Sequence, residues 1–289
     1  MLEAGPDLGE ASLCRGAARA HTGPVHVPTQ LQDGLERAKV VLTRYPRLYD
    51  SLRRPYALGR FLLRRPHDGE YAVFGQFGQR DGIFLDVGAN AGMSALSFRI
   101  YNKRNPIVSI EPNPFHEADL RFVARFVKPF SYRILAAADR DSSMTLHIPI
   151  YQGVPLTTEA SLIRSEVTSS PSLRSRLGKR MDSDDFKVVS REVPVTRLDT
   201  LGLDPAFIKL DVQGYEKAAL VGLEETLERA RPILFIETPD AELRDWLAER
   251  RYVAFRYLPE ERRLVERVHG ALNVVFVPIE EVGASHRSP

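Results

Sequence analysis

Short apolar runs of strand length alternate with stretches of helical periodicity through the middle of this 289-residue chain. Between the runs, apolar residues recur three or four positions apart, as in Met93, Leu96 and Ile100, which is the spacing of one helix face. Strands and helices that alternate in this way are joined by crossovers, so the pattern predicts an α/β fold with a doubly wound, mostly parallel sheet. The apolar runs are IFLDV (83–87), IVSIE (107–111), YRILA (132–136), FIKLD (207–211) and ILFIE (233–237).

Two more extended segments follow near the C-terminus. They are YVAFRY (252–257) and ALNVVFV (271–277), and a charged stretch separates them. Their β-branched and aromatic residues favour strands. We therefore expect them to pair as an antiparallel hairpin that closes one edge of the sheet.

The chain divides into stretches of different composition. Its first part is rich in Gly, Pro and Ala without periodicity, which is typical of a disordered leader. A polar stretch later interrupts the alternation between segments that look extended, and long inserts of this kind are either disordered or functional, for example as a lid. We expect a leader (1–30), a helical segment (31–77), a domain (78–280) with a polar insert (151–187), and a tail (281–289).

Composition and charge narrow the class of protein. Hydrophobic residues make up 43% of the chain and charged residues 27%, which fits a globular protein with a sizeable core. The formal net charge of +2 gives no electrostatic case for a nucleic-acid partner. A single cysteine, Cys14, forms no internal disulfide and favours a reducing compartment. We expect a cytoplasmic protein without a membrane span, because no signal-peptide core and no apolar run of about 18 residues occurs. The oligomeric state cannot be read from the sequence.

Acidic residues end four of the predicted strands: Asp86, Glu111, Asp211 and Glu237. In an open parallel sheet, ligands bind beyond the carboxyl ends of the strands, near the point where the strand order reverses. Buried carboxylates are costly without partners. Four acids at these ends therefore predict a polar cleft rather than four separate helix caps.

The first of these acids opens a glycine turn, DVGANAG (86–92). This turn differs from the GxGxxG pattern of dinucleotide-binding folds, and no GKS or GKT follows it as in a P-loop. An acid without an accompanying lysine repels a polyphosphate, so the turn favours a ligand with a cationic end and a ribose. NAD also has a ribose and stays an alternative, although the missing pyrophosphate turn argues against it.

Four separated motifs, taken together, are more specific than the turn alone: FLDVGANAGMSA (84–95), IEPNPF (110–115), VPVTRLDTL (193–201) and IKLDVQGYEKAALVG (208–222). In this order they resemble the signature stretches of the FkbM-type methyltransferases. The resemblance implies a class I methyltransferase fold, with a Rossmann-like, seven-stranded, mostly parallel sheet, helices on both faces and a C-terminal antiparallel hairpin. It also implies S-adenosyl-L-methionine as the cofactor and O-methylation of a hydroxyl on a sugar, glycan or secondary metabolite.

The resemblance assigns cofactor-binding roles to the glycine turn and to the acid after the second strand. Asp86, Gly88, Asn90 and Gly92 correspond to the turn that cradles the methionine part and the sugar. Glu111 corresponds to the acid that binds the ribose hydroxyls. These assignments follow from the matched motifs and not from periodicity or spacing.

Further positions follow from the same resemblance. Pro112 and Asn113 are expected to shape the adenosine edge of the site. Ala137 and Asp139, after the third strand, are expected to flank the adenine, and Asp211 is expected to face the methyl donor.

A neutral hydroxyl acceptor must lose a proton during methyl transfer, which requires a base or a metal. Asp211 and Glu237 are candidate catalytic groups, with orientation of the ligand as their alternative role. His147, beside the insert, is a third candidate, whereas we interpret His116 as a surface helix residue. A divalent metal beside Asp211 stays an unsupported option, because no cluster has diagnostic metal-ligand spacing, and we assign no metal ligand.

Other polar residues have two interpretations each. Asp199 is interpreted as the cap of a short helix, and Lys209 either neutralises a cleft carboxylate or extends to the surface. The arginines within 47–65 and 164–180 suit an anionic metabolite or a glycan, and those within 51–66 have a solvated helix face as their alternative. The partner is a small-molecule or glycan acceptor in our interpretation. A non-catalytic binding module on the same fold and an NAD-dependent oxidoreductase are the alternative functions.

Overall fold

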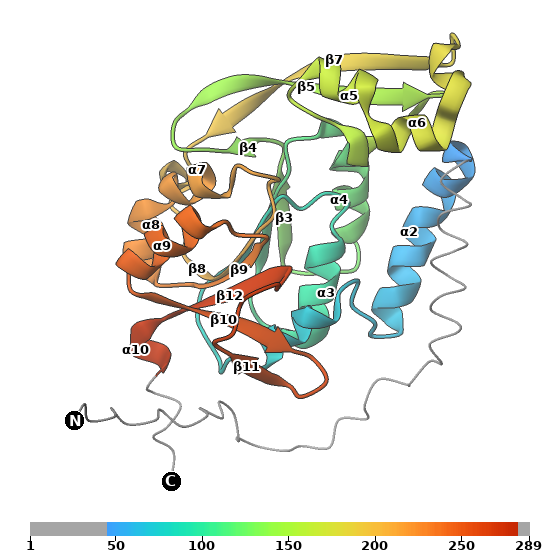
Figure 1. The fold of residues 1–289 in the computed structure, drawn as a ribbon. Coiled ribbons are helices and arrows are strands. Elements are labelled where there is room, and N and C mark those ends of the chain that lie inside the picture. Colours follow the sequence, from blue (N-terminus) through green and yellow to red (C-terminus); the bar gives the residue numbers. More distant parts are fainter. Residues whose placement is uncertain (1–44, 283–289) are drawn as a thin grey trace, which may run out of the picture.

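One large mixed sheet runs through the centre of the computed structural model, which describes residues 45–282 (Figure 1). Its strands lie in the order β11 (Arg263–Val265), β10 (Tyr252–Leu258), β12 (Asn273–Pro278), β9 (Ile233–Glu237), β8 (Pro205–Leu210), β1 (Ile83–Val87), β2 (Ile107–Ile110) and β3 (Phe130–Arg133). Pairing is parallel from β9 to β3 and antiparallel from β9 to β11. The protein therefore has an α/β fold built on a mixed sheet.

The sheet differs from the sequence-based expectation in three ways. The sheet has eight strands rather than seven, because the short strand β11 pairs with β10. β12 pairs antiparallel with β10, and it also lies against β9, inside the sheet and not at its edge. The third predicted strand ends earlier than expected, at Arg133. The alanines that follow it, β4 (Ala136–Ala137), pair in a second sheet instead.

Helices cover both faces of the main sheet (Figure 1). On one face lie α7 (Glu216–Val221), α8 (Glu224–Ala230) and α9 (Ala241–Glu249), and on the other lie α3 (Met93–Tyr101) and α4 (Glu117–Val123). Further out are α2 (Pro46–Leu62) and, at the C-terminal end, α10 (Ile279–Val282). Of the helices in the described range, none is both long and apolar enough to cross a membrane.

The alternation of side chains along each strand builds a separate core on each face. Phe84 of β1 and Phe207 of β8 pack with Phe98 of α3 and with Phe74 of the 3-10 helix η1 (Gly69–Gly75). The rings of Phe84 and Phe98 stack at a centroid distance of 3.9 Å. On the opposite face, strand residues such as Leu85 pack against α7, α8 and α9. Neither core covers the carboxyl ends of the central strands, so a site can form there.

A second, four-stranded sheet lies across the carboxyl ends of the main sheet (Figure 1). Its order is β4, β7 (Phe186–Thr196), β5 (Ser142–Tyr151) and β6 (Val154–Pro155). The predicted insert 151–187 contributes α5 (Arg164–Ser169), α6 (Pro171–Leu177) and the 3-10 helices η3 (Thr157–Glu159) and η4 (Gly178–Asp182). Leu173 and Val167 of these helices belong to a small core of their own. The insert is therefore an ordered cover rather than a structureless loop.

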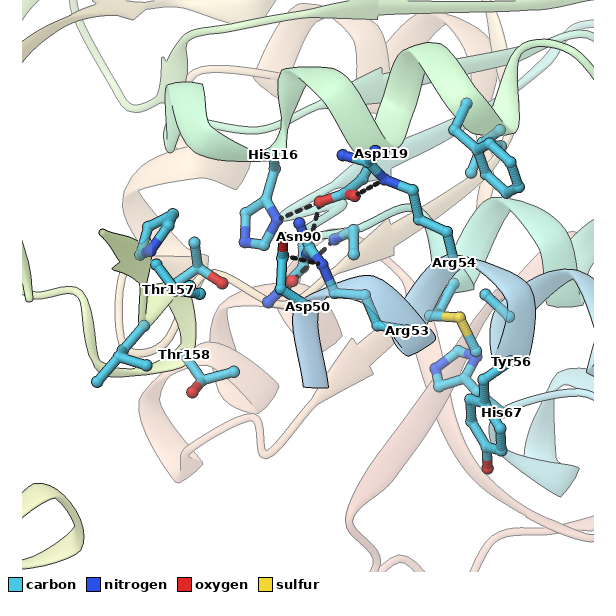
Figure 2. Close-up of a pocket in the computed structure, with 18 of the residues that line it drawn as sticks. Asp50, Arg53, Arg54, Tyr56, His67, Asn90, His116, Asp119, Thr157 and Thr158 are labelled. Atoms are coloured by element: carbon cyan, nitrogen blue, oxygen red, sulfur yellow. Dashed lines mark hydrogen bonds and ion pairs between the residues drawn. The ribbon is translucent and has the colours of Figure 1, made fainter. Parts of the chain in front are cut away.

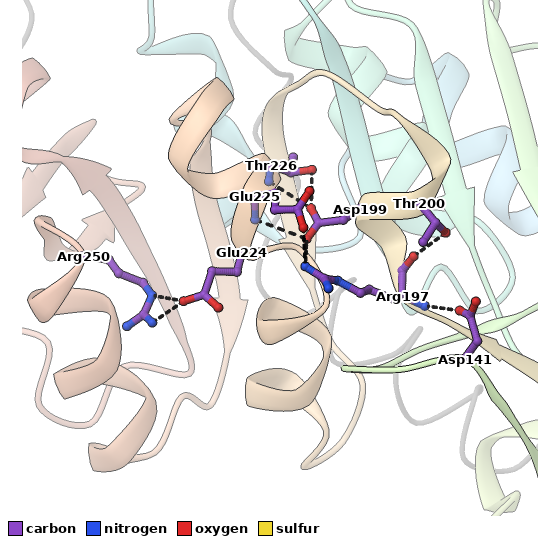
Figure 3. Close-up of polar contacts among 8 residues, drawn as sticks. All are labelled: Asp141, Arg197, Asp199, Thr200, Glu224, Glu225, Thr226 and Arg250. Carbon is purple, nitrogen blue, oxygen red and sulfur yellow. Dashed lines mark hydrogen bonds and ion pairs between the residues drawn. The ribbon is translucent and has the colours of Figure 1, made fainter.

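The motif VPVTRLDTL positions a helix (Figure 3). Asp199 lies in the 3-10 helix η5 (Leu198–Leu201), and its carboxylate accepts hydrogen bonds from the backbone amides of Thr226, at 2.9 Å, and Glu225, at 3.2 Å. Arg197 donates to the same carboxylate at 3.0 Å. Asp199 thus satisfies free amides in the first turn of α8. It lies inside η5, which has no side-chain cap, so it holds a different helix from the short local one that the sequence predicted.

Candidate functional site

The glycine turn after β1 lies directly against the end of β8. Gly88 has a φ of +78°, and an added Cβ atom would stand 1.8 Å from the backbone oxygen of Asp211. Only glycine fits this position, because both the left-handed backbone and the close approach exclude a side chain. Asn90 continues the turn with a φ of +48°. The turn and the end of β8 therefore form one continuous surface.

Glu111 ties this turn to the end of β2. The Asn90 amide donates to its Oε2 at 2.7 Å, and the Asn113 amide donates to its Oε1 at 2.8 Å. Burial raises the pKa of Glu111, and His116 and the two amides offset part of that effect. Because each carboxylate oxygen accepts more than one hydrogen bond, the fixed carboxylate can still bind a hydroxyl.

Asp86 lies beneath the turn and not in a cavity. Its side chain is fully buried, and its Oδ2 accepts hydrogen bonds from Ser94, at 2.6 Å, and Ser109, at 3.0 Å. The expected direct contact of Asp86 with a ligand is therefore corrected to a supporting role. The strand alternation turns its side chain toward α3, together with that of Phe84.

A cavity of about 460 Å³ lies above these strand ends, under the second sheet. Met144, Leu146 and Ser161 of the second sheet and the adjoining segment form its cover. Seven predicted site residues line this cavity, and they come from four separate loops: Gly88, Asn90, Glu111, Pro112, Asn113, Ala137 and Asp211.

Three other predicted cofactor residues do not line the large cavity. Asp86 is the buried support described above, and Gly92 is buried at the start of α3. A Cβ atom on Gly92 would stand 2.9 Å from a methyl carbon of Val123, so this glycine allows α3 and α4 to pack closely. Asp139 is exposed beyond the cavity.

Lys209 links the carboxylates at the cavity floor. Its Nζ lies 2.6 Å from the Gly88 carbonyl oxygen, 3.3 Å from Asp211 Oδ2 and 3.8 Å from Asp86 Oδ1. The lysine is buried. Of its two sequence-based interpretations, neutralisation of cleft carboxylates is therefore the one confirmed.

Glu237 ends β9 close enough to Asp211 for the two carboxyl groups to interact. Burial and the neighbouring Asp211 carboxylate raise the pKa of Glu237 to about 7. The Glu237 carboxyl group therefore exchanges its proton near neutral pH. This pair can accept or release a proton at the edge of the cavity.

The structure places the two histidines that the sequence singled out differently from the expectation. His116 is 2% exposed, lies at the end of the 3-10 helix η2 (Pro114–His116), and has its Nδ1 3.3 Å from Asp119 Oδ2. It lines the large cavity, so its interpretation as a surface residue was wrong. His147 lies in β5 with its Nδ1 2.9 Å from Ser190 Oγ, and it is absent from the lining of this cavity among the described residues.

The sequence-based expectations assigned no role at the site to His116 or to Glu216. Glu216 accepts hydrogen bonds from the amides of Val212 and Gly214, both at 3.1 Å to its Oε1, and so fixes the loop after β8. The signal for His116 was the acid three residues later, since Asp119 lies on the same helix face. Within residues 45–282, no group of three or more His, Cys, Asp or Glu side chains is arranged to hold a metal ion.

The sequence model of the methyltransferase FkbM domain matches residues 86–254, which is more than half of the chain. No curated protein matches the chain. Among solved structures, the chain is similar to a methyltransferase FkbM from Methylobacillus flagellatus KT, with 15% identity, a TM-score of 0.44, and coverage of 85% of this chain and 60% of that chain. It is also similar to a precorrin-6y C5,15-methyltransferase from Geobacter metallireducens GS-15, with 12% identity, a TM-score of 0.34, and coverage of 72% and 83%. The chain thus spans 60% of the length of the first of these structures.

Proposed function

Since the chain belongs to the family of methyltransferases that contain the FkbM domain, we propose that it transfers the methyl group of S-adenosyl-L-methionine to a hydroxyl oxygen of a sugar, glycan or secondary metabolite. One observation carries the proposal. The Gly88 turn, which tolerates no side chain, and the Glu111 carboxylate, held by two backbone amides, meet at one cavity. We assign the catalytic domain to residues 78–280 and its sheet to the class I methyltransferase type.

The residues of the large cavity fit this cofactor. Gly88 presents bare backbone to a ligand, and the fixed oxygens of Glu111 suit ribose hydroxyls. Asn113 adds a buried amide nitrogen, Nδ2, that has no hydrogen-bond partner within residues 45–282. A buried donor without a partner is rare in native proteins, and an adenosine nitrogen or oxygen would satisfy it. A volume of about 460 Å³ lies within the range of roughly 300–1,000 Å³ for small-molecule sites.

The cofactor supplies an activated methyl group with its own leaving group, so the protein mainly positions the reactants. The acceptor hydroxyl must still lose its proton. The geometry favours the pair of Asp211 and Glu237 as the proton acceptor over His147, because Asp211 lines the cavity and Lys209 holds it in place. With a pKa of about 7, the ionised carboxylate of Glu237 is matched to accept that proton near neutral pH.

The two alternative functions predict different ligands. A binding module that has lost catalysis does not require a fixed Glu111 carboxylate or the tight contact at Gly88. A dinucleotide-dependent oxidoreductase needs a place for a pyrophosphate, and the acids at the ends of β8 and β9 disfavour one. The intact cavity therefore favours the methyltransferase.

Thermal unfolding with added ligand tests this proposal. We expect S-adenosylmethionine and S-adenosylhomocysteine to stabilise the full chain, by about 2.7 kcal/mol at a hundredfold excess over Kd, and NAD to have no effect. Glu111→Gln should weaken S-adenosylhomocysteine binding by about tenfold, through loss of charge-assisted hydrogen bonds. The matched control is Asp139→Asn, which changes an exposed acid outside the cavity. Stabilisation by NAD alone would exclude the proposal.

A further inference from the structure

A second cavity, of about 300 Å³, adjoins the large one. Asn90, His116, Thr157 and Thr158 line both cavities, so these side chains form the boundary between the two. Figure 2 shows this boundary beside the α2 arginines. A molecule in the smaller cavity therefore has direct access to the ligand site beside Asn90.

Arginine dominates the charge of the smaller cavity. Arg53 and Arg54 of α2 both bind Asp119, at 2.6 and 2.7 Å (Figure 2). Asp50 binds Arg53 at 2.9 Å. Across the cavity, Arg176 of α6 pairs with Glu159 at 3.2 Å.

One guanidinium group in the lining has only neutral hydrogen-bond partners among the described residues. Arg60 donates to the Tyr56 hydroxyl, at 3.0 Å, and to the Pro66 carbonyl oxygen. Four arginines thus meet three carboxylates in and around the cavity, which leaves one positive charge in excess. An anion is the ligand that balances it.

Two arginine nitrogens at the cavity also lack partners. The Nε atoms of Arg60 and Arg176 are buried without a hydrogen-bond partner in the part of the chain that the structure describes. Buried donors without partners are costly. The start of α3, at Ala91 and Met93, lines the same cavity, and a helix N-terminus adds positive potential there. These features favour a carboxylate or phosphate group.

The remaining lining suits an organic molecule rather than a free ion. Ala57, Phe122 and Leu156 supply apolar surface for a carbon skeleton, and Thr157 and Thr158 supply hydroxyl groups. Building on the proposed function, we propose that the smaller cavity is the acceptor subsite and that it binds a carboxylate or phosphate group of the acceptor. The hydroxyl that receives the methyl group then lies toward the boundary at Asn90.

Phosphate titration of the full chain tests the subsite without knowledge of the acceptor. The protein is first saturated with S-adenosylhomocysteine, and inorganic phosphate or acetate is then titrated against sodium chloride of equal ionic strength. We expect phosphate or acetate to raise the unfolding temperature beyond the effect of chloride, and the stronger of the two identifies the preferred group. Arg60→Gln should weaken this binding by about tenfold, the factor for one charge-assisted hydrogen bond.

Three further variants separate an effect of charge from an effect on the fold. Arg60→Lys keeps the charge and should recover part of the affinity. Arg47→Gln is the matched control, because Arg47 belongs to the same helix, is exposed, binds the Gln152 carbonyl oxygen and does not line the cavity. Arg176→Gln tests the opposite wall independently of α2. All variants should bind S-adenosylhomocysteine with affinities within about twofold of the original chain.

Three results would overturn the proposal. The first is an effect of phosphate and acetate no larger than that of chloride, and the second is unchanged anion binding in both Arg60→Gln and Arg176→Gln. The third is a loss of S-adenosylhomocysteine affinity in Arg60→Gln with unchanged affinity for 5′-methylthioadenosine, which would place the cofactor's own carboxylate in the cavity. If the original chain fails to bind S-adenosylhomocysteine, the proposed function fails instead, and the anion titration without it still decides whether the cavity binds anions.

Discussion

Single residues at the strand ends fix the shape of the candidate site. Gly88 permits contact between the turn and the backbone of Asp211. Lys209 balances the charge of Asp86 and Asp211 from inside the sheet. Asp211 and Glu237 then share the remaining negative charge at the cavity edge. Each of these contacts lies within a few residues of a strand end, so small substitutions there should have large local effects.

Gly88→Ala should abolish S-adenosylhomocysteine binding, because the new methyl group overlaps the Asp211 carbonyl oxygen. The matched control is Gly153→Ala, since Gly153 has nearly the same φ, +80°, but open space around a Cβ atom. The control should lose only the strain energy of the left-handed backbone, about 1–2 kcal/mol. Isothermal titration calorimetry and urea unfolding measure the two effects, and equal losses in both variants would contradict the steric argument.

The raised pKa of Glu237 predicts a stability that depends on pH. Because its folded-state pKa, about 7, exceeds the ordinary value of 4.5, the folded protein binds the proton more tightly than the unfolded chain. The stabilisation is therefore complete below pH 4.5 and is lost as the pH rises through 7. After solvent screening we expect a loss on the order of 1 kcal/mol.

Glu237→Gln is the test of this pH dependence. The glutamine cannot ionise, so its stability relative to the original chain should rise between pH 4.5 and 7.5 in urea unfolding. Asp240→Asn, at a nearby exposed acid, should show no such trend. Parallel curves for the original chain and Glu237→Gln would show that Glu237 titrates normally.

At the scale of elements, a motif far from the cavity positions the helix after β8. Asp199 holds the first turn of α8, and Arg197 connects that carboxylate to Glu225 at 2.8 Å (Figure 3). The Arg197 amide also donates to Asp141 at 2.8 Å, which joins the second sheet to this cap. The motif thus links the two sheets and stays outside the ligand site.

Asp199→Ala should destabilise the protein by about 1–2 kcal/mol, the loss expected for a helix cap. Ligand affinity should stay the same, because the residue lies outside both cavities. Urea unfolding measures the first quantity, and calorimetry with S-adenosylhomocysteine measures the second. Asp199→Asn, which keeps the hydrogen-bond acceptor, should lose less, and an equal loss would point to charge instead.

At the scale of the whole molecule, α2 is held beside the smaller cavity by ion pairs as well as by apolar contacts of Ala57 and Phe61 with the core. Arg53 and Arg54 both bind the buried carboxylate of Asp119. Burial alone would raise the pKa of Asp119, but hydrogen bonds from His116 and Arg54 and the charge of Arg53 lower it. One ionised side chain of α4 therefore helps to hold α2 in position.

Asp119→Asn should release α2 and cost on the order of 1–3 kcal/mol at neutral pH. Because the folded pKa of Asp119 lies below 3.8, the difference from the original chain should persist down to about pH 4 and disappear as the pH falls further. Hydrogen exchange over residues 46–62 should quicken in the variant. Asp50→Asn, at the more exposed partner of Arg53, is the control and should leave the exchange unchanged.

Much of the main sheet could be predicted from the sequence. The strands at 83–87 and 233–237 agree with their predicted bounds, because apolar runs that end on an acid mark a buried strand and its exit. The third strand does not agree with its predicted bounds, because its pairing with β2 ends at Arg133 and the following alanines pair with β7. An apolar run in the sequence does not show which of the two sheets the segment joins.

The candidate site was predicted only where the chain supplies it locally. The expected positions at Gly88, Glu111 and Asp211 meet at one cavity because parallel strands bring their carboxyl ends to one edge. The interpretation of Asp86 and His116 failed, since cover by other elements decides whether a polar residue faces a ligand or the interior. The leader, 1–30, lies outside the described residues.

The sequence by itself determined the alternation of strands and helices, the family, and the glycine turn with its acids, because these depend on neighbours within a few residues. Only the tertiary structure decided that α2 and the 151–187 segment meet over the strand ends and form a second cavity between them. About a hundred residues separate Arg60 from Arg176, and no local spacing relates them. Their convergence results from packing of the second sheet and α2 against the main domain, and a charge balance of this kind exists only in the folded chain.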